Sequence, residues 1–135
     1  YLDYTFRGNS DLPAIVSFDK NTEQLKRVRK IASDLGILLK EGIYTWTLGP
    51  SYETPAEIQD IISLGGNAVG MSTVPEIERA HDLNFSLLAM ACLTNYAVGI
   101  SEDILTHQEV VAQANKSGKL FSDLLLNILR KIDRL

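Results

Sequence analysis

Polar side chains follow three apolar runs of this chain, and their types could bind a small organic molecule. The first run ends in Gly-Pro-Ser-Tyr-Glu at residues 49–53, the second in Gly-Met-Ser-Thr at residues 70–73, and the third in Thr94-Asn95. Ligands of parallel α/β folds bind at the carboxyl ends of the strands. If these runs are neighbouring strands, we expect their polar ends to form one site.

Glu53 and Asn95 are the side chains best suited to recognise a ring with hydrogen-bonding groups. Asn95 carries one acceptor and two donors, which suits the mixed edge of a purine. Each residue also has a local explanation. Glu53 could complement the dipole of a following helix, which contributes about 0.3–1 kcal/mol, and Asn95 could bond its own turn. Tyr52 taken alone indicates packing rather than stacking on a ligand.

The second end, at Ser72, has the features of an anion site. Backbone N–H groups at a helix N-terminus attract negative charge, and Ser72 could add a hydroxyl donor. Simple capping by Thr73 explains the same residues without a ligand. His107 begins the last expected helix and could reach the strand ends, although a helix-end role also fits. His81 lies among charged residues and is expected to be solvated.

The first part of the chain predicts one helix and one strand. Apolar residues at helical spacing indicate a helix over residues 21–34, capped by Asn21 and stopped at Gly36. The aromatic and β-branched run 42–49 is bounded by glycines and indicates a strand. Residues 1–20 contain no element that we can place, and we expect them to be irregular.

Thr-x-x-Glu boxes mark the starts of the remaining helices. Thr54 and Glu57 enclose Pro55, so a helix is expected over residues 55–64. Two further boxes begin helices near residue 74 and over residues 107–132; they pair Thr73 with Glu76 and Thr106 with Glu109.

Two apolar runs between these helices predict strands. The first covers residues 67–71. The second, residues 85–93, is nearly all apolar, as expected of a strand buried on both faces. Cys92 lies within it and is expected to be a buried structural thiol. A loop over residues 94–105 precedes the last helix.

The alternation of helices and strands points to an α/β fold. We expect three layers, with a mixed, largely parallel β-sheet flanked by helices. The chain of 135 residues has no linker and no repeat, which fits one domain or part of one.

Composition excludes several classes of protein. The net charge of −4 and the pI near 5.1 argue against a nucleic-acid-binding protein, which would present a basic face. No run is long and apolar enough to predict a membrane span, and no signal peptide is expected. The single cysteine suits a reducing cytoplasm. Since the first residue is Tyr1, we expect the chain to begin inside a longer product or after processing.

Four motifs occur together: GPSYETPAE, GNAVGMSTVPE, the Thr-Asn pair and THQEV. Their order and spacing resemble those of purine nucleoside phosphorylases of the trimeric type. The resemblance covers residues 20–132 and corresponds to the C-terminal half of a family chain, whereas residues 1–20 match poorly. Where the family ends a helix in Arg-His-x-Gly, this chain has His81 for the arginine. Asn84 replaces the glycine, which a left-handed helix cap accepts.

The resemblance implies how the base is bound. Glu53 would bond the N1 side of the purine, Asn95 its O6/N7 edge, and Tyr52 would stack near base and sugar. An amide N–H at N7 would stabilise the negative charge that develops on the departing purine. Asn95 favours 6-oxopurines, because the related methylthioadenosine phosphorylases carry aspartate at this position.

The resemblance also implies how the sugar and phosphate are bound. Met71 would lie against the ribose, and Ser72 would hold phosphate. Thr73 would line the base pocket or the sugar side, and His107 would touch the ribose 5′-hydroxyl. With Glu53 and Asn95, His107 completes the implied catalytic set.

The implied activity is phosphorolysis of 6-oxopurine nucleosides, namely inosine, guanosine and their deoxy forms. The products are the free base and (deoxy)ribose 1-phosphate, in purine salvage. Inorganic phosphate is the co-substrate and no cofactor is implied. The sequence contains no metal-ligand cluster, nucleophile elbow or glycine-rich dinucleotide loop. A homotrimer is expected from the resemblance alone.

The N-terminal half of the family would supply a glycine- and serine-rich phosphate loop, with an arginine and a histidine that neutralise phosphate. None of these motifs occurs in the 135 residues. Two other functions therefore stay open: a non-catalytic purine-binding or assembly module, and a nucleosidase that uses water on the same fold. Phosphate dependence separates phosphorolysis from hydrolysis, and purine binding without turnover would indicate the module.

Overall fold

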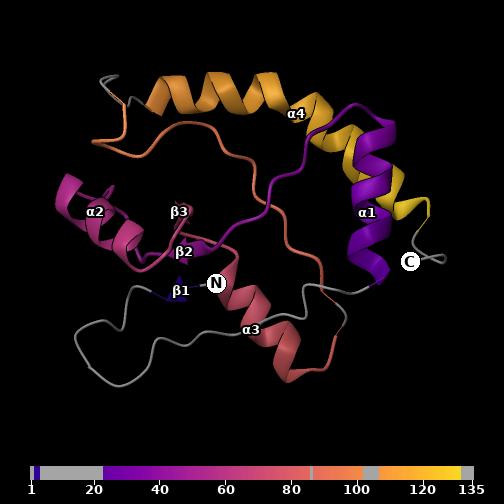
Figure 1. Cartoon of the computed structure of the whole chain (residues 1–135), viewed down its shortest axis with the longest axis horizontal. Helices are drawn as coiled ribbons and strands as arrows, with labels where there is room; N and C mark the ends of the chain where they lie inside the picture. The colour runs from indigo at the N-terminus through magenta and orange to yellow at the C-terminus, as the bar shows by residue number, and fades with distance from the viewer. Residues whose placement is uncertain (1, 4–22, 86, 102–106, 132–135) are drawn as a thin grey trace. The chain divides into compact units, whose positions relative to one another are not determined.

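A computed structural model describes residues 2–3, 23–85, 87–101 and 107–131 (Figure 1). The chain forms two compact units, Tyr1–Ser17 with Gly42–Leu105 and Phe18–Glu41 with Thr106–Leu135. The first unit contains β1 (Leu2–Asp3), β2 (Tyr44–Trp46), α2 (Pro55–Ser63), β3 (Ala68–Gly70) and α3 (Val74–Asp82). The second contains α1 (Glu23–Asp34) and α4 (His107–Leu129).

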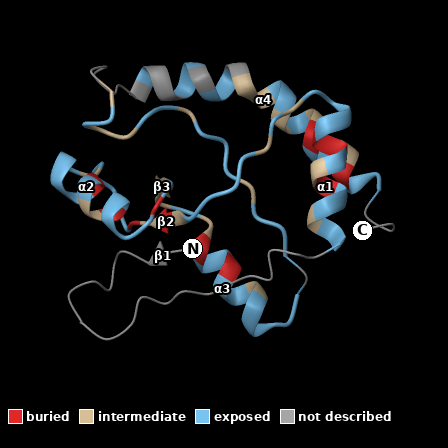
Figure 2. Ribbon diagram, viewed as in Figure 1, coloured by how far each residue is buried: buried red, intermediate tan, exposed pale blue. Residues whose placement is uncertain are grey.

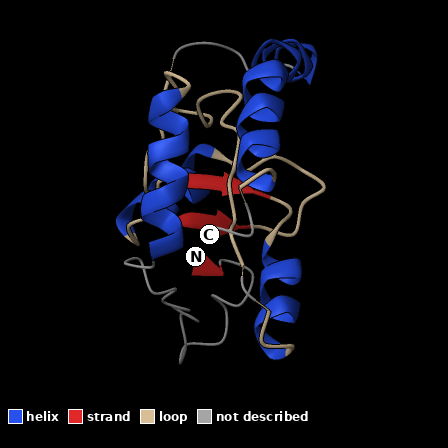
Figure 3. Cartoon of the chain, turned by 90° about the vertical axis from the view of Figure 1, so that its right-hand side faces the viewer, coloured by secondary structure: helices blue, strands red, loops and turns tan. Residues whose placement is uncertain are grey.

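The first unit is built on a parallel sheet with the strand order β1-β2-β3 (Figure 3). The register sets Trp46 of β2 opposite Gly70 of β3, and Thr45 opposite Leu2 of β1. The N–H of Thr47 donates to the carbonyl of Gly70 at 3.0 Å and extends the ladder by one residue. α2 lies in the crossover between β2 and β3, which parallel neighbours require.

Alternation along β2 sorts its side chains between the two faces of the sheet. Thr45 and Thr47 are buried, whereas Tyr44 and Trp46 are half-buried. The helices add aliphatic side chains to the core of this unit (Figure 2): Ile58, Ile61, Val74 and Ile77. Burying an aliphatic side chain of this size contributes about 1.5–3 kcal/mol relative to exposure.

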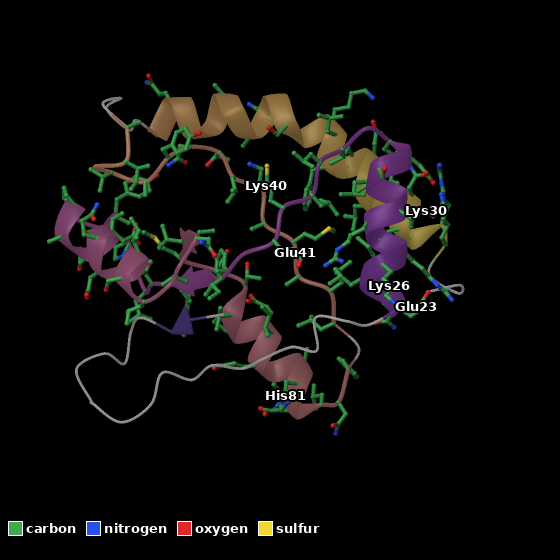
Figure 4. The ribbon with its side chains drawn as sticks, viewed as in Figure 1. Glu23, Lys26, Lys30, Lys40, Glu41 and His81 are labelled. Atoms are coloured by element: carbon green, nitrogen blue, oxygen red, sulfur yellow. The ribbon has the colours of Figure 1, made fainter. Side chains whose placement is uncertain are left out.

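The second unit consists of α1 in contact with α4. Buried aliphatic side chains lie on both helices (Figure 2): Val28, Ile31, Ala32, Leu124 and Ile128. The exposed face of α1 carries ion pairs of Lys26 with Glu23 at 3.4 Å and of Lys30 with Asp34 at 3.1 Å (Figure 4). Because exposed pairs contribute about 0–1 kcal/mol, the aliphatic contact dominates the stability of this unit.

The helices α1, α2 and α3 end in the same kind of turn. A residue with positive φ follows each helix, Gly36 at 70°, Gly65 at 90° and Asn84 at 55°. After α2, the N–H groups of residues 65–66 donate to the carbonyls of residues 61–62 at 2.9 and 3.0 Å. These bonds satisfy carbonyls that the helix leaves free. The predicted glycine stops and the left-handed cap at Asn84 are confirmed.

Most predicted elements are present, and the strands are shorter than predicted. α1 lies within the predicted residues 21–34, α2 within 55–64 and α4 within 107–132, and α3 begins at Val74. β2 lies within the predicted residues 42–49 and β3 within 67–71. The predicted cap at Asn21 and the box of Thr106 with Glu109 rest on residues outside the described part. No described helix is long and apolar enough to cross a membrane.

The strand predicted over residues 85–93 is wrong for its described residues, 85 and 87–93, which form no strand. Phe85 and Leu93 are 68% and 63% exposed, and Cys92 is exposed instead of buried. A strand buried on both faces needs a neighbour for its backbone N–H and C=O groups. β1 and β3 each pair only with β2, and no described pairing joins this run to the open edge of either strand.

The start of the chain and the start of α3 also differ from prediction. Residues 1–20 are not wholly irregular, because Leu2–Asp3 form β1. Thr73 gives α3 no side-chain cap and has a φ of 79°, so the predicted box with Glu76 does not form. An N-cap side chain reaches the helix N–H groups from an extended backbone, which Thr54 has and Thr73 lacks.

Candidate functional site

The turn after β2 carries Glu53 and is tied to the strand by a short hydrogen bond. The hydroxyl of Thr47 donates to Oε1 of Glu53 at 2.6 Å, and the bond is partly buried. Gly49 lies between them with a φ of 66°, a left-handed conformation that favours glycine. A charge-assisted bond of this length restricts the orientation of the carboxylate.

The N-terminus of α2 is capped without help from Glu53. The Thr54 hydroxyl accepts from the Glu57 N–H at 3.4 Å, and Glu57 accepts from the Thr54 N–H at 2.7 Å. The bond from the Thr54 backbone, and then that from its hydroxyl, lower the pKa of Glu57. The predicted capping box is thus confirmed. Glu53 is bonded back to β2 instead, which weakens the alternative that it serves only the helix dipole.

The end of β3 lies against the turn after β2. A Cβ added to Gly49 would overlap the thioether of Met71, so the two strand ends are in contact. The Tyr44 hydroxyl donates to the carbonyl of Ser72 at 3.2 Å. The hydroxyls of Ser72 and Thr73 lie 3.2 Å apart, and either can donate. Two of the three predicted strand ends are therefore brought together.

The start of α3 is the place where the sequence predicts an anion site. Thr73 makes no side-chain hydrogen bond to the first turn, and Ser72 beside it is exposed. The N–H of Val74 donates to the carbonyl of Ser72 at 2.9 Å, and Pro75 has no N–H, so only the N–H of Glu76 has no described partner in the first turn. This group and the helix dipole are what the start of α3 offers to an anion.

Asn95 is exposed and bonds its own neighbours. Its Oδ1 accepts from the Thr94 hydroxyl at 2.6 Å, and its Nδ2 donates to the next carbonyl at 2.9 Å. This is the arrangement that the turn alternative predicts. The loop that follows reaches the start of α2, where a Cβ on Gly99 would lie 3.4 Å from the Cβ of Pro55. No described hydrogen bond joins Asn95 to Glu53.

The remaining predicted residues are not drawn into a common site by described contacts. Tyr52 is 53% exposed. His107 begins α4 in the second unit, and its side chain lies outside the described part. Its predicted place at the sugar therefore stays a prediction. His81 is exposed on α3, as predicted (Figure 4).

The sequence matches a known family over nearly its whole length. A family profile described as the phosphorylase superfamily covers residues 3–130. The chain belongs to this superfamily. Curated phosphorylases of the superfamily include purine nucleoside phosphorylase 1 of Geobacillus stearothermophilus, 43% identical over 100 residues. The probable 6-oxopurine nucleoside phosphorylase of Moorella thermoacetica is 42% identical over 104 residues.

These matches cover 74% and 76% of this chain but only 36% and 40% of the two phosphorylases. The chain therefore spans well under half the length of these two curated relatives. The motif resemblance is confirmed at the level of the family.

Solved phosphorylase structures share the fold. The Schistosoma mansoni purine nucleoside phosphorylase in complex with inosine has a TM-score of 0.76 and 30% identity, over 82% of this chain and 41% of that chain. The S. mansoni methylthioadenosine phosphorylase shares the fold with a TM-score of 0.71 and 23% identity, over 80% and 46%. The predicted α/β fold class is confirmed, and the coverage is consistent with a partial domain.

Sequence reasoning passed over Thr47 and Tyr44. Thr47 is buried directly after β2 and bonds Glu53. One signal in the sequence could have indicated Thr47. It places a hydroxyl at an inward position of the predicted strand, shortly before the polar residues 49–53. The bond from Tyr44 to Ser72 joins residues 28 apart, and nothing local in the sequence indicates it.

Proposed function

We propose that this chain forms the C-terminal half of a purine nucleoside phosphorylase. The enzyme cleaves 6-oxopurine nucleosides (inosine, guanosine and their deoxy forms) with inorganic phosphate. It releases the free base and (deoxy)ribose 1-phosphate, a step of purine salvage. Relatives with this name support the activity. The observation that carries the proposal is Glu53, a partly buried carboxylate held at a strand end by Thr47 at 2.6 Å.

Glu53 and Asn95 recognise the base. Because Thr47 bonds Oε1 of Glu53, Oε2 is the oxygen that accepts the N1 hydrogen of a 6-oxopurine. The Asn95 amide exchanges its bonds within the turn for bonds to O6 and N7 of the base. Its N–H then stabilises the negative charge on the departing purine.

Residues of the turn between β3 and α3, with His107 of α4, serve the sugar and the phosphate. Met71 lies against the ribose, with Thr73 and Tyr52 lining the pocket beside it. Ser72 holds phosphate together with the dipole at the start of α3, and His107 bonds the 5′-hydroxyl. Positive charge develops on the sugar as the glycosidic bond breaks. Phosphate held beside C1′ avoids much of the entropic penalty of a bimolecular attack.

The rest of the enzyme completes the phosphate site. We assign to it the glycine- and serine-rich loop, with the arginine and histidine that neutralise phosphate. Phosphate is the co-substrate, and no further cofactor enters the reaction. A cytoplasmic homotrimer is the expected assembly.

Binding of free hypoxanthine to the purified 135-residue chain tests base recognition. Calorimetry should show binding that Asn95→Ala weakens about 10- to 100-fold, because an unpaired polar group left in a site costs about 1–3 kcal/mol. Asn95→Asp is the sharper variant, since a carboxylate repels O6 but accepts from a 6-amino group. It should move the preference from hypoxanthine toward adenine. Equal binding of both bases by the wild type would contradict the proposal.

A further inference from the structure

Thr47 is bonded through both its backbone and its side chain. Its N–H donates to the Gly70 carbonyl at 3.0 Å, which fixes the residue to β3. Its hydroxyl donates to Oε1 of Glu53 at 2.6 Å. Thr47 directly follows β2 and is only 8% exposed, and alternation places it on the same face as the buried Thr45. Thr47 therefore gives Glu53 a rigid, nearly dry donor at the edge of the sheet.

We infer that Thr47 is a positioning residue that orients the Glu53 carboxylate for the purine. This inference rests on the proposed function, in which Glu53 accepts the N1 hydrogen. A free glutamate side chain samples several rotamers, and ordering it opposes binding. With Oε1 already bonded, the other oxygen is held in one direction before the base arrives. Affinity for a base that carries an N1 hydrogen is thereby raised, and affinity for a base without one is not.

Thr45 of β2, two residues before Thr47, provides a matched control. It is completely buried on the same face as Thr47, and its Oγ1 has no hydrogen-bond partner. Replacing either threonine by valine exchanges a hydroxyl for a methyl group of similar size. Only the change at Thr47 removes a described hydrogen bond, so a difference between the two variants reports on the bond to Glu53 and not on packing.

The experiment measures binding of hypoxanthine and 1-methylhypoxanthine, whose N1 carries a methyl group instead of hydrogen. The wild type should prefer hypoxanthine. Thr47→Val should lose about 10-fold in affinity for hypoxanthine, the effect of one charge-assisted bond, with little change for the methylated base. Thr47→Ser should restore the preference, and Thr45→Val should keep it. If Thr47→Val does not fold, Thr47→Ala takes its place.

The outcomes separate this inference from the proposed function. A wild type that prefers hypoxanthine, with the same preference in Thr47→Val, would overturn the role of Thr47 alone. A wild type that binds both bases equally would overturn the role of Glu53, and the inference with it. Equal losses in Thr47→Val and Thr45→Val would show a packing effect and would also overturn the inference.

Discussion

β2 and the run 85–93 were both predicted as strands that end at site residues, yet the turn after β2 is held in place by side-chain bonds and the described part of the run forms no strand. At the first, Thr47 bonds Glu53 at 2.6 Å and Thr54 bonds Glu57 at 2.7 Å. Along the second, apolar side chains remain exposed, up to 68% at its first residue.

The difference separates what neighbouring residues determine from what a strand requires. A capping box or a turn bond joins side chains a few positions apart and needs no other element. An interior strand needs hydrogen-bond partners on both sides and packing on both faces. Hydrophobicity alone therefore does not bury the run 85–93, whose described residues pair with neither edge strand of the sheet.

The sharpest test of this comparison removes an aliphatic side chain from each region. Ile61 of α2 is 3% exposed, whereas Leu93 is 63% exposed. Ile61→Ala should lower the free energy of unfolding by about 2–5 kcal/mol, because it leaves a cavity. Leu93→Ala should change it by less than about 0.5 kcal/mol. Urea denaturation of the two variants checks this, and equal losses would show that Leu93 is buried after all.

Substituting two glycines with similar backbone angles should give the next largest loss of stability. Gly49 has a φ of 66° and Gly99 of 77°, so alanine at either position carries a left-handed penalty of about 1–2 kcal/mol. Gly49→Ala should lose more, because its Cβ would also displace Met71, while Gly99→Ala meets Pro55 at an ordinary 3.4 Å. Thermal melts compare the two. A larger loss in Gly99→Ala would contradict the contact between the ends of β2 and β3.

The N-caps of α2 and α3 should differ in how much they stabilise the chain, by a smaller free energy than the glycines. Thr54→Ala should destabilise by about 0.5–2 kcal/mol, because it removes an N-cap acceptor. Thr73 makes no such bond, so Thr73→Ala should have a smaller effect in the same denaturation assay. Similar losses would mean that Thr73 also caps its helix in solution.

The box of α2 predicts a dependence on pH. Hydrogen bonds from Thr54 lower the pKa of Glu57 in the folded chain. The stability gained is therefore fully present above the unfolded pKa and is lost as the pH falls through the folded pKa. The stability difference between wild type and Glu57→Gln should be largest near neutral pH and shrink in acid. Denaturation across a pH series measures it, and a constant difference would argue against the charged box.

Cys92 should have the smallest effect on stability. The thiol is exposed, so Cys92→Ser should change the free energy of unfolding by less than about 0.5 kcal/mol. In the native chain, a thiol reagent should label Cys92 without denaturant. Protection that is lifted only by urea would restore the prediction of a buried strand.

The sequence predicted the helices well because their signals are local. Thr54 with Glu57, and the glycines at 36 and 65, mark helix ends through neighbouring residues. The strand pairing and the bond from Tyr44 to Ser72 depend on contacts distant in sequence, so they could not be predicted. The base-binding role of Asn95 was predicted from the family resemblance. The hydrogen bonds that Asn95 makes in this structure are those of the turn that contains it.

Cleavage of inosine with and without phosphate tests the central claim most directly. Hypoxanthine release would be followed for the enzyme that contains this chain, beside its Asn95→Ala variant. The account predicts release that requires millimolar phosphate and collapses in the variant. Release at the same rate without phosphate would contradict it and would indicate a nucleosidase that uses water.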